Sequence, residues 1–85
     1  MEIGSVVYSK SGHDKDEAYL VIGVEEKSGY LVLVDGKRRP LENPKRKNPK
    51  HLKDLGEKIP EAIEKFREEK LMDSDLVWYL KPYRK

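Results

Sequence analysis

The sequence contains no cysteine and no long hydrophobic run. Without cysteine the chain can form neither a disulfide nor a thiolate metal site, and a reducing compartment suits it. Its longest apolar stretch, residues 18–24, is much shorter than the roughly 20 residues that a membrane-spanning helix needs. The first residues also lack the basic start and apolar core of a secretory signal. We therefore expect a cytoplasmic protein that has no membrane partner.

The chain offers little room and few side chains for catalysis. Its 85 residues form at most one domain, and a domain of this size buries only about 60–65% of the surface that its unfolded chain exposes. His13 and His51 are the only histidines, and neither belongs to a nucleophile or metal-binding motif. We therefore predict no catalytic residue and no cofactor, and we expect a monomer.

A group of carboxylates near the N-terminus raises the question of a metal site. Asp14 and Asp16 are followed directly by Glu17, and hard cations such as calcium take clustered carboxylates. An EF-hand loop that began at Asp14 would need glycine at its sixth position, but Tyr19 stands there. The sequence therefore favours a solvated turn at these residues and no metal.

The charged residues are distributed unevenly, although the net charge is only +2. Residues 1–36 sum to −4 and residues 54–75 also to −4, whereas residues 37–53 sum to +7 and residues 76–85 to +3. The chain is therefore polarised, with its positive charge concentrated in one short segment.

The first half of the chain has the pattern of a strand meander. Short runs rich in β-branched and aromatic residues occupy residues 6–8, 18–24 and 30–34, with turn residues between them. Asp35-Gly36 follows the third run directly, and this dipeptide favours a two-residue hairpin turn. We therefore predict three strands and a return strand at residues 37–41.

Proline and asparagine interrupt the segment that follows. Because proline cannot donate a ladder hydrogen bond, we expect residues 42–50 to form a basic, extended arm beyond an edge strand. The alternating residues 51–55 predict a last strand that closes a small barrel before Gly56 breaks the chain. This organisation makes residues 1–55 a β-barrel unit.

Beyond Gly56 the pattern changes to helical spacing. Ile59, Ile63 and Phe66 lie on one side of a helix, and Pro60 suits its first turn. A second short helix follows, with Asp73 or Ser74 as its cap and Pro82 near its end, and it carries the apolar residues Leu76, Tyr79 and Leu80 on one side. Short amphipathic helices are not stable alone, so we expect residues 56–85 to form a helical extension packed on the barrel.

The positive segment favours a polyanionic partner. Its eight cations, all within residues 37–53, are Lys37, Arg38, Arg39, Lys45, Arg46, Lys47, Lys50 and Lys53. Such a density next to a compact β-unit suits a phosphate backbone, and a solvated face or an acidic protein partner are the alternatives. RNA is favoured over DNA because the sequence has no helix-turn-helix and no zinc finger.

Two segments carry a resemblance to a known family. Residues 3–22, IGSVVYSKSGHDKDEAYLVI, resemble a KOW motif, in which a loop glycine, here Gly12, lies between β segments. Residues 30–41, YLVLVDGKRRPL, and the later Lys50-His51-Leu52 extend the resemblance to small bacterial KOW-domain RNA-binding proteins, which are related to KOW-bearing large-subunit ribosomal proteins. The resemblance covers residues 2–54 and implies an SH3-like β-barrel that binds RNA, often ribosomal RNA, without catalysis. It also implies a place on the ribosome or in translation or ribosome assembly.

The resemblance and the positive segment together give a set of predicted site residues. By position in the family, the loop at residues 10–15 and the hairpin at residues 37–39 would face the RNA. Asp16 and Glu17 depart from the family pattern by adding negative charge to the loop, which shifts the expected contacts toward the hairpin and arm. Gly12 and Gly36 are expected to serve as structural turns. The predicted RNA-binding residues are Lys10, His13, Lys15, Lys37, Arg38, Arg39, Lys45, Arg46, Lys47, Lys50, His51 and Lys53.

A second function remains open from the sequence. Trp78, Tyr79 and Tyr83 lie close together, and exposed aromatic residues can anchor protein interfaces. The alternative is therefore an interaction adaptor whose barrel or C-terminal helices bind a protein. The sequence does not identify the RNA, and it does not distinguish a permanent ribosomal component from a transient factor.

Overall fold

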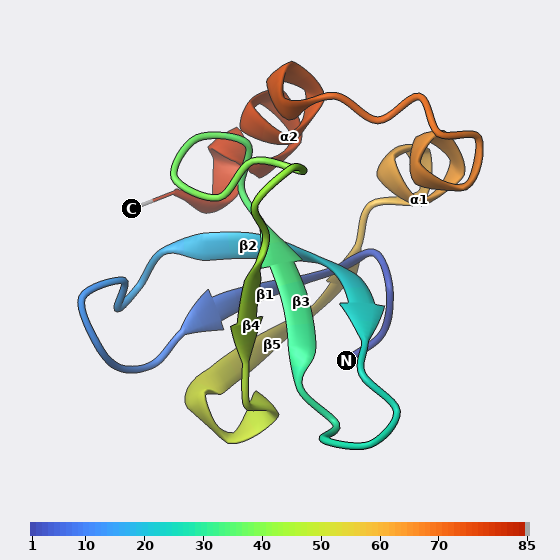
Figure 1. Cartoon of the computed structure of the whole chain (residues 1–85). Coiled ribbons are helices and arrows are strands. Elements are labelled where there is room, and N and C mark those ends of the chain that lie inside the picture. Colours follow the sequence, from blue (N-terminus) through green and yellow to red (C-terminus); the bar gives the residue numbers. More distant parts are fainter. Residues whose placement is uncertain (85) are drawn as a thin grey trace.

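The protein is an antiparallel sheet followed by two α-helices (Figure 1). The structure is a computed structural model that describes residues 1–84. Over these residues the elements are β1 (Ser5–Ser9), β2 (Ala18–Val24), β3 (Leu31–Val34), β4 (Lys45–Lys47), β5 (Leu52–Lys58), α1 (Pro60–Arg67) and α2 (Asp73–Leu80), with short 3-10 helices η1 (Pro49–His51) and η2 (Lys81–Tyr83).

The strands form one five-stranded sheet in the order β4-β3-β2-β1-β5. All neighbouring strands are antiparallel, and β1 lies between β2 and β5. The first strand in sequence therefore pairs with the last. The structure confirms the strands that the sequence predicted at residues 6–8, 18–24 and 30–34, with bounds that differ by one residue at most.

The predicted return strand at residues 37–41 is wrong. β3 pairs instead with β4, in a register that places Leu31 opposite Lys47 and Leu33 opposite Lys45. The carboxylate of Asp35 accepts hydrogen bonds from the backbone N–H of Lys37 and of Arg39, both at 2.9 Å. Because an aspartate that binds nearby backbone groups competes with ladder formation, the chain forms a loop after Val34 and returns only at Lys45.

The segment predicted as an extended arm is therefore an edge strand followed by a turn. β4 forms at its centre, and in η1 the side chain of Asn48 accepts a hydrogen bond from the N–H of Lys50 at 3.1 Å. The last strand is confirmed but runs further than predicted. Gly56 does not end it; this glycine lies within β5 at φ +74, in the part of the strand where pairing with β1 is irregular.

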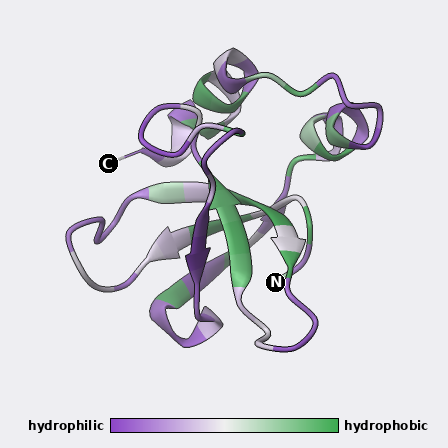
Figure 2. Cartoon of the chain, viewed as in Figure 1, coloured by the Kyte–Doolittle hydropathy of each residue, from purple (hydrophilic) through white to green (hydrophobic). Residues whose placement is uncertain are grey.

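Two apolar clusters lie on opposite faces of the sheet. One contains strand residues only, namely Val7, Tyr19, Val21, Leu31, Leu33 and Leu52. The other joins the sheet to the helices through Leu20, Val34, Ala62, Leu71 and Leu76. Alternate residues of β2 enter different clusters, which explains why this strand is apolar along most of its length. Figure 2 shows the hydrophobic colour along β3 beside the hydrophilic edge strand β4.

Both helices lie on the same side of the sheet (Figure 1). α1 begins at Pro60 and α2 at Asp73, close to the predicted positions. The predicted cap of α2 is wrong, because Met72 occupies the N-cap and its N–H donates to the Asp75 carboxylate at 3.0 Å. The Asp73 carboxylate instead accepts a hydrogen bond from the N–H of Leu41 at 2.8 Å and so connects the helix to the loop after β3.

The helices of residues 1–84 are short, and none has the length and apolar composition to cross a membrane.

Candidate nucleic-acid interface

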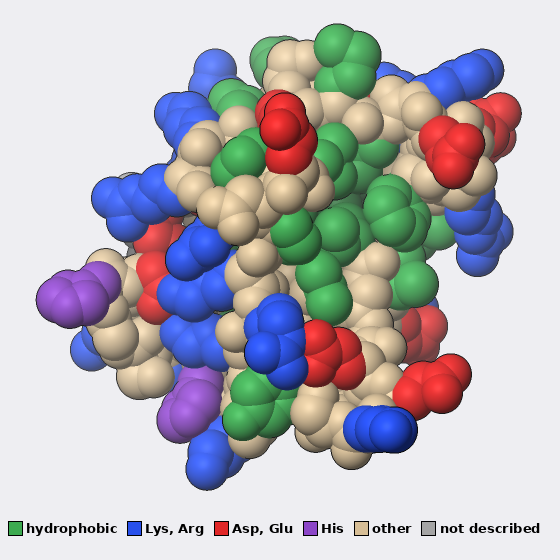
Figure 3. Space-filling view, in the orientation of Figure 1, with side chains coloured by type: hydrophobic (Ala, Val, Ile, Leu, Met, Phe, Trp, Pro, Cys, Tyr) green, Lys and Arg blue, Asp and Glu red, His purple; other side chains and the backbone are tan. Residues whose placement is uncertain are grey.

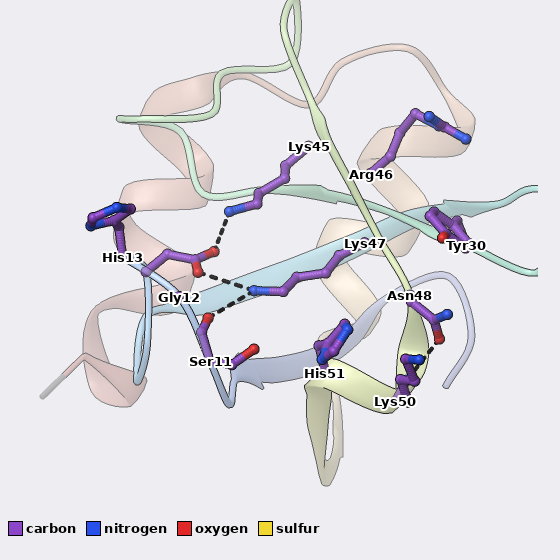
Figure 4. Close-up of a pocket in the computed structure, with 11 residues that line it drawn as sticks. Ser11, Gly12, His13, Tyr30, Lys45, Arg46, Lys47, Asn48, Lys50 and His51 are labelled. Atoms are coloured by element: carbon purple, nitrogen blue, oxygen red, sulfur yellow. Dashed lines mark hydrogen bonds and ion pairs between the residues drawn. The ribbon is translucent and has the colours of Figure 1, made fainter.

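A shallow hollow of about 520 Å³ lies where the loop after β1 meets β4 and η1 (Figure 4). Its lining residues are Ser11, Gly12, His13, Asp14, Tyr30, Lys45, Arg46, Lys47, Asn48, Lys50 and His51. The lining includes six of the twelve predicted RNA-binding residues and the predicted turn glycine Gly12. Four lysine or arginine side chains and one carboxylate give it a net charge of +3 with both histidines neutral.

The three cations of the edge strand β4 lie on its two sides, because side chains alternate along a strand. Lys45 and Lys47 point to one side, whereas Arg46 between them points to the other side (Figure 4). Both lysines reach the Asp14 carboxylate on their side. Successive side chains of a strand face opposite ways, so this division follows directly from the strand that replaces the predicted arm.

Asp14 is the centre of a buried cluster on the first of these sides. Its side chain is only 8% exposed, and its carboxylate lies 2.5 Å from the Lys45 Nζ and 3.0 Å from the Lys47 Nζ. The hydroxyls of Ser9 and Tyr19 also donate to it, at 2.9 and 3.0 Å. The predicted solvated turn is therefore wrong for Asp14.

Ionisation of Asp14 is strongly favoured by these contacts. Burial opposes the charged form, but the hydrogen bonds from Lys45, Lys47, Ser9 and Tyr19 outweigh it and hold the pKa of Asp14 well below its usual range. Burial and then the hydrogen bond to Asp14 raise the pKa of Tyr19 above its ordinary value. The carboxylate is thus a fixed negative charge between two lysines.

The Lys47 ammonium group makes all of its hydrogen bonds within this cluster. Its ammonium group donates to the Asp14 carboxylate, to the Ser11 carbonyl at 3.1 Å and to the Ser9 hydroxyl. An ammonium group has three N–H donors, and these three acceptors use all of them. Since the Lys47 side chain is only 12% exposed, its role is to attach β4 to the loop after β1 rather than to reach a ligand.

Arg46 has a different environment on the exposed side of β4. Its guanidinium group donates through Nη2 and Nε to the two carboxylate oxygens of Glu25, the first at 2.7 Å. It also lies 5.4 Å from the centre of the Tyr30 ring. The hydrogen bonds from Arg46 and then from Ser28 lower the pKa of Glu25 to about 2, and the bond with Glu25 raises the pKa of Arg46.

The other basic residues that line the hollow, Lys50 and the two histidines, are exposed. Among residues 1–84, no carboxylate forms an ion pair with Lys50, His51 or His13. Lys10 lies next to them, because its N–H donates to the carbonyl of His51 at 2.8 Å. Lys10 and Lys50 supply the charge of a cationic rim around the neutralised Asp14 cluster, and His13 and His51 lie in the same rim.

The other predicted site residues lie outside the hollow. Lys10, Lys15 and Lys53 are exposed but do not line it, and Lys37, Arg38 and Arg39 belong to the loop between β3 and β4. Figure 3 shows a group of lysine and arginine side chains along the side of the molecule that carries both histidines, and further ones on the opposite side among carboxylates.

Both predicted turn glycines have the backbone conformation that the sequence indicated. Gly12 has a φ of +86° and Gly36 a φ of +82°, in the left-handed region that favours glycine. Gly12 turns the loop that carries His13 and Asp14 into the hollow, and Gly36 turns the loop that carries Lys37.

Sequence reasoning missed Asp14 and its partners Ser9 and Tyr19. A signal was present: Lys45 and Lys47 have the two-residue spacing of one strand face, so a buried carboxylate was the partner to look for. The spacing is meaningful only after residues 45–47 are known to form a strand. Within residues 1–84, no group of three or more histidine, aspartate or glutamate side chains could hold a metal ion.

A scan of the chain against models of known protein families finds no match, and a search of curated proteins finds no relative.

Proposed function

We propose that this protein binds RNA, without catalysing a reaction, through the cationic rim of the hollow beside β4. The observation that carries the proposal is the charge arrangement there. Asp14 supplies the only carboxylate that lines the hollow within residues 1–84, and Lys45 and Lys47 already neutralise it. The exposed cations around it therefore act on an incoming phosphate without competition from Asp14. The resemblance of residues 3–22 to a KOW motif supports RNA as the source of that phosphate.

We also propose that the sheet is an SH3-like barrel of the KOW type. The Lys47 ammonium of β4 donates a hydrogen bond to the Ser9 hydroxyl of β1, although β3 and β2 lie between these two strands in the sheet. Side chains so far apart in a sheet meet only when it curls strongly. With this fold, the family resemblance favours structured RNA, such as ribosomal RNA, and a place on the ribosome or in its assembly.

The contacts divide the basic residues into two roles. Lys45 and Lys47 hold β4 against the loop after β1, and they shape the site from within. Lys50, His51 and Lys10 are exposed and supply the phosphate contacts. A charge reversal at Lys45 or Lys47 would place a second carboxylate beside Asp14 and would test folding rather than RNA binding.

The test is therefore Lys50→Glu, with Lys70→Glu as the matched control. Both lysines are exposed, and Lys70 follows α1, away from the hollow. Fluorescence anisotropy with a labelled RNA hairpin should show about tenfold or greater weakening for Lys50→Glu, because a charged hydrogen bond is lost. The slope of log affinity against log salt should also fall by about 0.7–0.9.

Lys70→Glu changes the net charge equally and should leave the slope at the wild-type value. Equal losses of affinity in the two variants would show that only overall charge matters and would reject this site. A wild-type protein that does not bind the hairpin even at low salt would reject the proposed function itself.

A further inference from the structure

Trp78, the only tryptophan of the chain, lies on the solvent side of α2. It is 70% exposed, whereas Leu76 and Leu80 of the same helix are fully buried. The helix is therefore anchored to the sheet by its leucines, and the indole contributes little to the core. A large planar ring left in solvent on a rigid helix is a surface on which a ligand can stack.

The surroundings of Trp78 are cationic. On one side, a hollow of about 480 Å³ is lined by Lys37, Ser74, Val77, Trp78, Lys81 and Arg84. On the other side, Trp78 lines a second hollow of about 290 Å³ together with Tyr79, Lys81 and Pro82. Among the described residues 1–84, no carboxylate lines either hollow. The Lys81 ammonium lies 5.9 Å from the centre of the indole ring.

The lysines beside the indole are available to a ligand. Within the described residues 1–84, neither Lys37 nor Lys81 forms an ion pair with a carboxylate. A phosphate that approached Trp78 would therefore meet two exposed ammonium groups. It would not have to displace a carboxylate from either of them, and the only ring contact that Lys81 makes among residues 1–84 is with Trp78 itself.

Tertiary contacts hold Lys37 beside Trp78, although 41 positions separate them in the sequence. Gly36 packs so closely on α2 that an added Cβ would lie 2.9 Å from the Cβ of Leu76. The Arg84 guanidinium also donates to the Asp35 carbonyl at 3.4 Å. The loop after β3 is thus fixed to both ends of the C-terminal helical segment.

We propose that Trp78 is a stacking platform for an unpaired RNA base, with the adjoining phosphates held by Lys37 and Lys81. This inference rests on the proposed function and adds a second subsite to it. Base stacking on an aromatic ring next to cations is the common arrangement for single-stranded nucleic acid. The loop that carries Lys37 also carries Arg38 and Arg39, so cationic residues continue from the platform along the chain toward β4.

An acidic peptide is the competing ligand, and the shape of the site favours the nucleotide. Tryptophan anchors of protein interfaces insert into pockets of the partner and carry their energy through the enclosed ring. Here the cations lie beside the ring on the same surface, within the reach of one nucleotide and its phosphate. This arrangement matches a ligand that joins a flat apolar group to a negative charge.

The single tryptophan provides a direct readout. We would titrate the full chain with short single-stranded oligoadenylate, with duplex RNA of equal length and with an acidic oligoglutamate peptide, and record indole fluorescence. The single strand should quench the emission in a saturable manner, because a stacked base contacts the ring, and the duplex should quench it much less. Trp78→Ala has no indole, so its affinity is measured by fluorescence anisotropy of a labelled single strand, and binding should weaken by roughly 5- to 150-fold.

Two further variants make the result decisive. Trp78→Phe keeps an aromatic face and should retain most of the single-strand affinity. Met72→Ala, which removes a residue that is 60% exposed at the other end of α2, should not change it. Far-ultraviolet circular dichroism of each variant checks that the fold is intact, as expected for substitutions of exposed side chains.

The outcomes separate this inference from the proposed function. If the hairpin RNA binds but Trp78→Ala retains the full single-strand affinity and RNA leaves the wild-type emission unchanged, the platform is rejected and the function stands. If only the oligoglutamate peptide quenches, the surface binds acidic protein segments and the platform is again rejected. If no RNA binds the wild-type protein, both proposals fail.

Discussion

Asp14→Asn should destabilise the fold strongly, because it removes the charge that two lysines share. Breaking a buried ion pair from one side costs about 3–5 kcal/mol, since the remaining charge is left without compensation. The Lys47 side chain is 12% exposed but the Lys45 side chain is 27% exposed, so water partly compensates the second charge. We therefore expect a loss of about 3 kcal/mol in the free energy of unfolding.

A loss of this size is large for so small a domain. For a domain of 60–100 residues, about 1 kcal/mol corresponds to roughly 4–8 °C in Tm, so Asp14→Asn should lower Tm by about 12–24 °C. Urea and thermal unfolding followed by circular dichroism measure it. Glu42→Gln is the control, because Glu42 is exposed and forms no ion pair within residues 1–84, and it should stay within about 0.5 kcal/mol of the wild type.

The role of Lys47 as the main partner of Asp14 is tested by combining Lys47→Met with Asp14→Asn in one double variant. The double variant has no uncompensated ammonium at the most buried position, so it should recover part of the lost stability, with a coupling energy of about 1 kcal/mol or more. The reasoning would be refuted by a Tm decrease below about 4 °C in Asp14→Asn. A coupling energy near zero would contradict the role of Lys47.

Acid titration gives an independent check on the same group. Because the pKa of folded Asp14 lies below that of the unfolded chain, its contribution to stability is complete above the unfolded pKa and is lost as the pH falls. The unfolded pKa is about 4, so the wild type should lose stability more steeply than Asp14→Asn below about pH 4. Parallel pH profiles of the two proteins would contradict the low pKa of Asp14.

Two further predictions concern the packing that positions the site. Gly36→Ala should lower the free energy of unfolding in urea by about 2 kcal/mol or more, because the alanine would combine a positive φ with a clash against α2. Gly56 also has a positive φ but faces open space, so Gly56→Ala should lower it by only about 1–2 kcal/mol. Equal losses in the two alanine variants would argue against the packing of the loop on α2. Tyr8→Phe should lower the free energy of unfolding by about 0.5–1.5 kcal/mol, because the Tyr8 hydroxyl donates to the Tyr83 carbonyl at 2.5 Å. An unchanged midpoint of urea unfolding would show that this contact does not hold the C-terminal segment on β1.

The sequence predicted the strands and helices that depend on local pattern. The apolar run of β2 and the helical spacing of Ile59, Ile63 and Phe66 are visible without any tertiary contact. The return strand was misplaced because Asp35-Gly36 has the composition of a tight hairpin. The Asp35 side chain instead accepts hydrogen bonds from the backbone N–H groups of Lys37 and Arg39, which composition does not reveal.

The sequence predicted which residues make the candidate site basic, but it did not predict what each of these residues does. The density of cations at residues 37–53 identified the basic side of the molecule. It could not separate Lys47, whose donors are all used internally, from Lys50, which is exposed. That division depends on a carboxylate located more than thirty positions earlier in the chain.

The sequence by itself determined the polarity of this protein, its β-rich first half and its helical C-terminal segment, because these follow from composition and from the two- and 3.6-residue periods of apolar residues. Only the tertiary structure decided which charges are available. Pairing of β4 with β3 brings Lys45 and Lys47 to Asp14, and packing of the Gly36 loop on α2 brings Lys37 to Trp78. Both juxtapositions join residues distant in sequence, and the free energy of a charge depends on the groups that surround it in space.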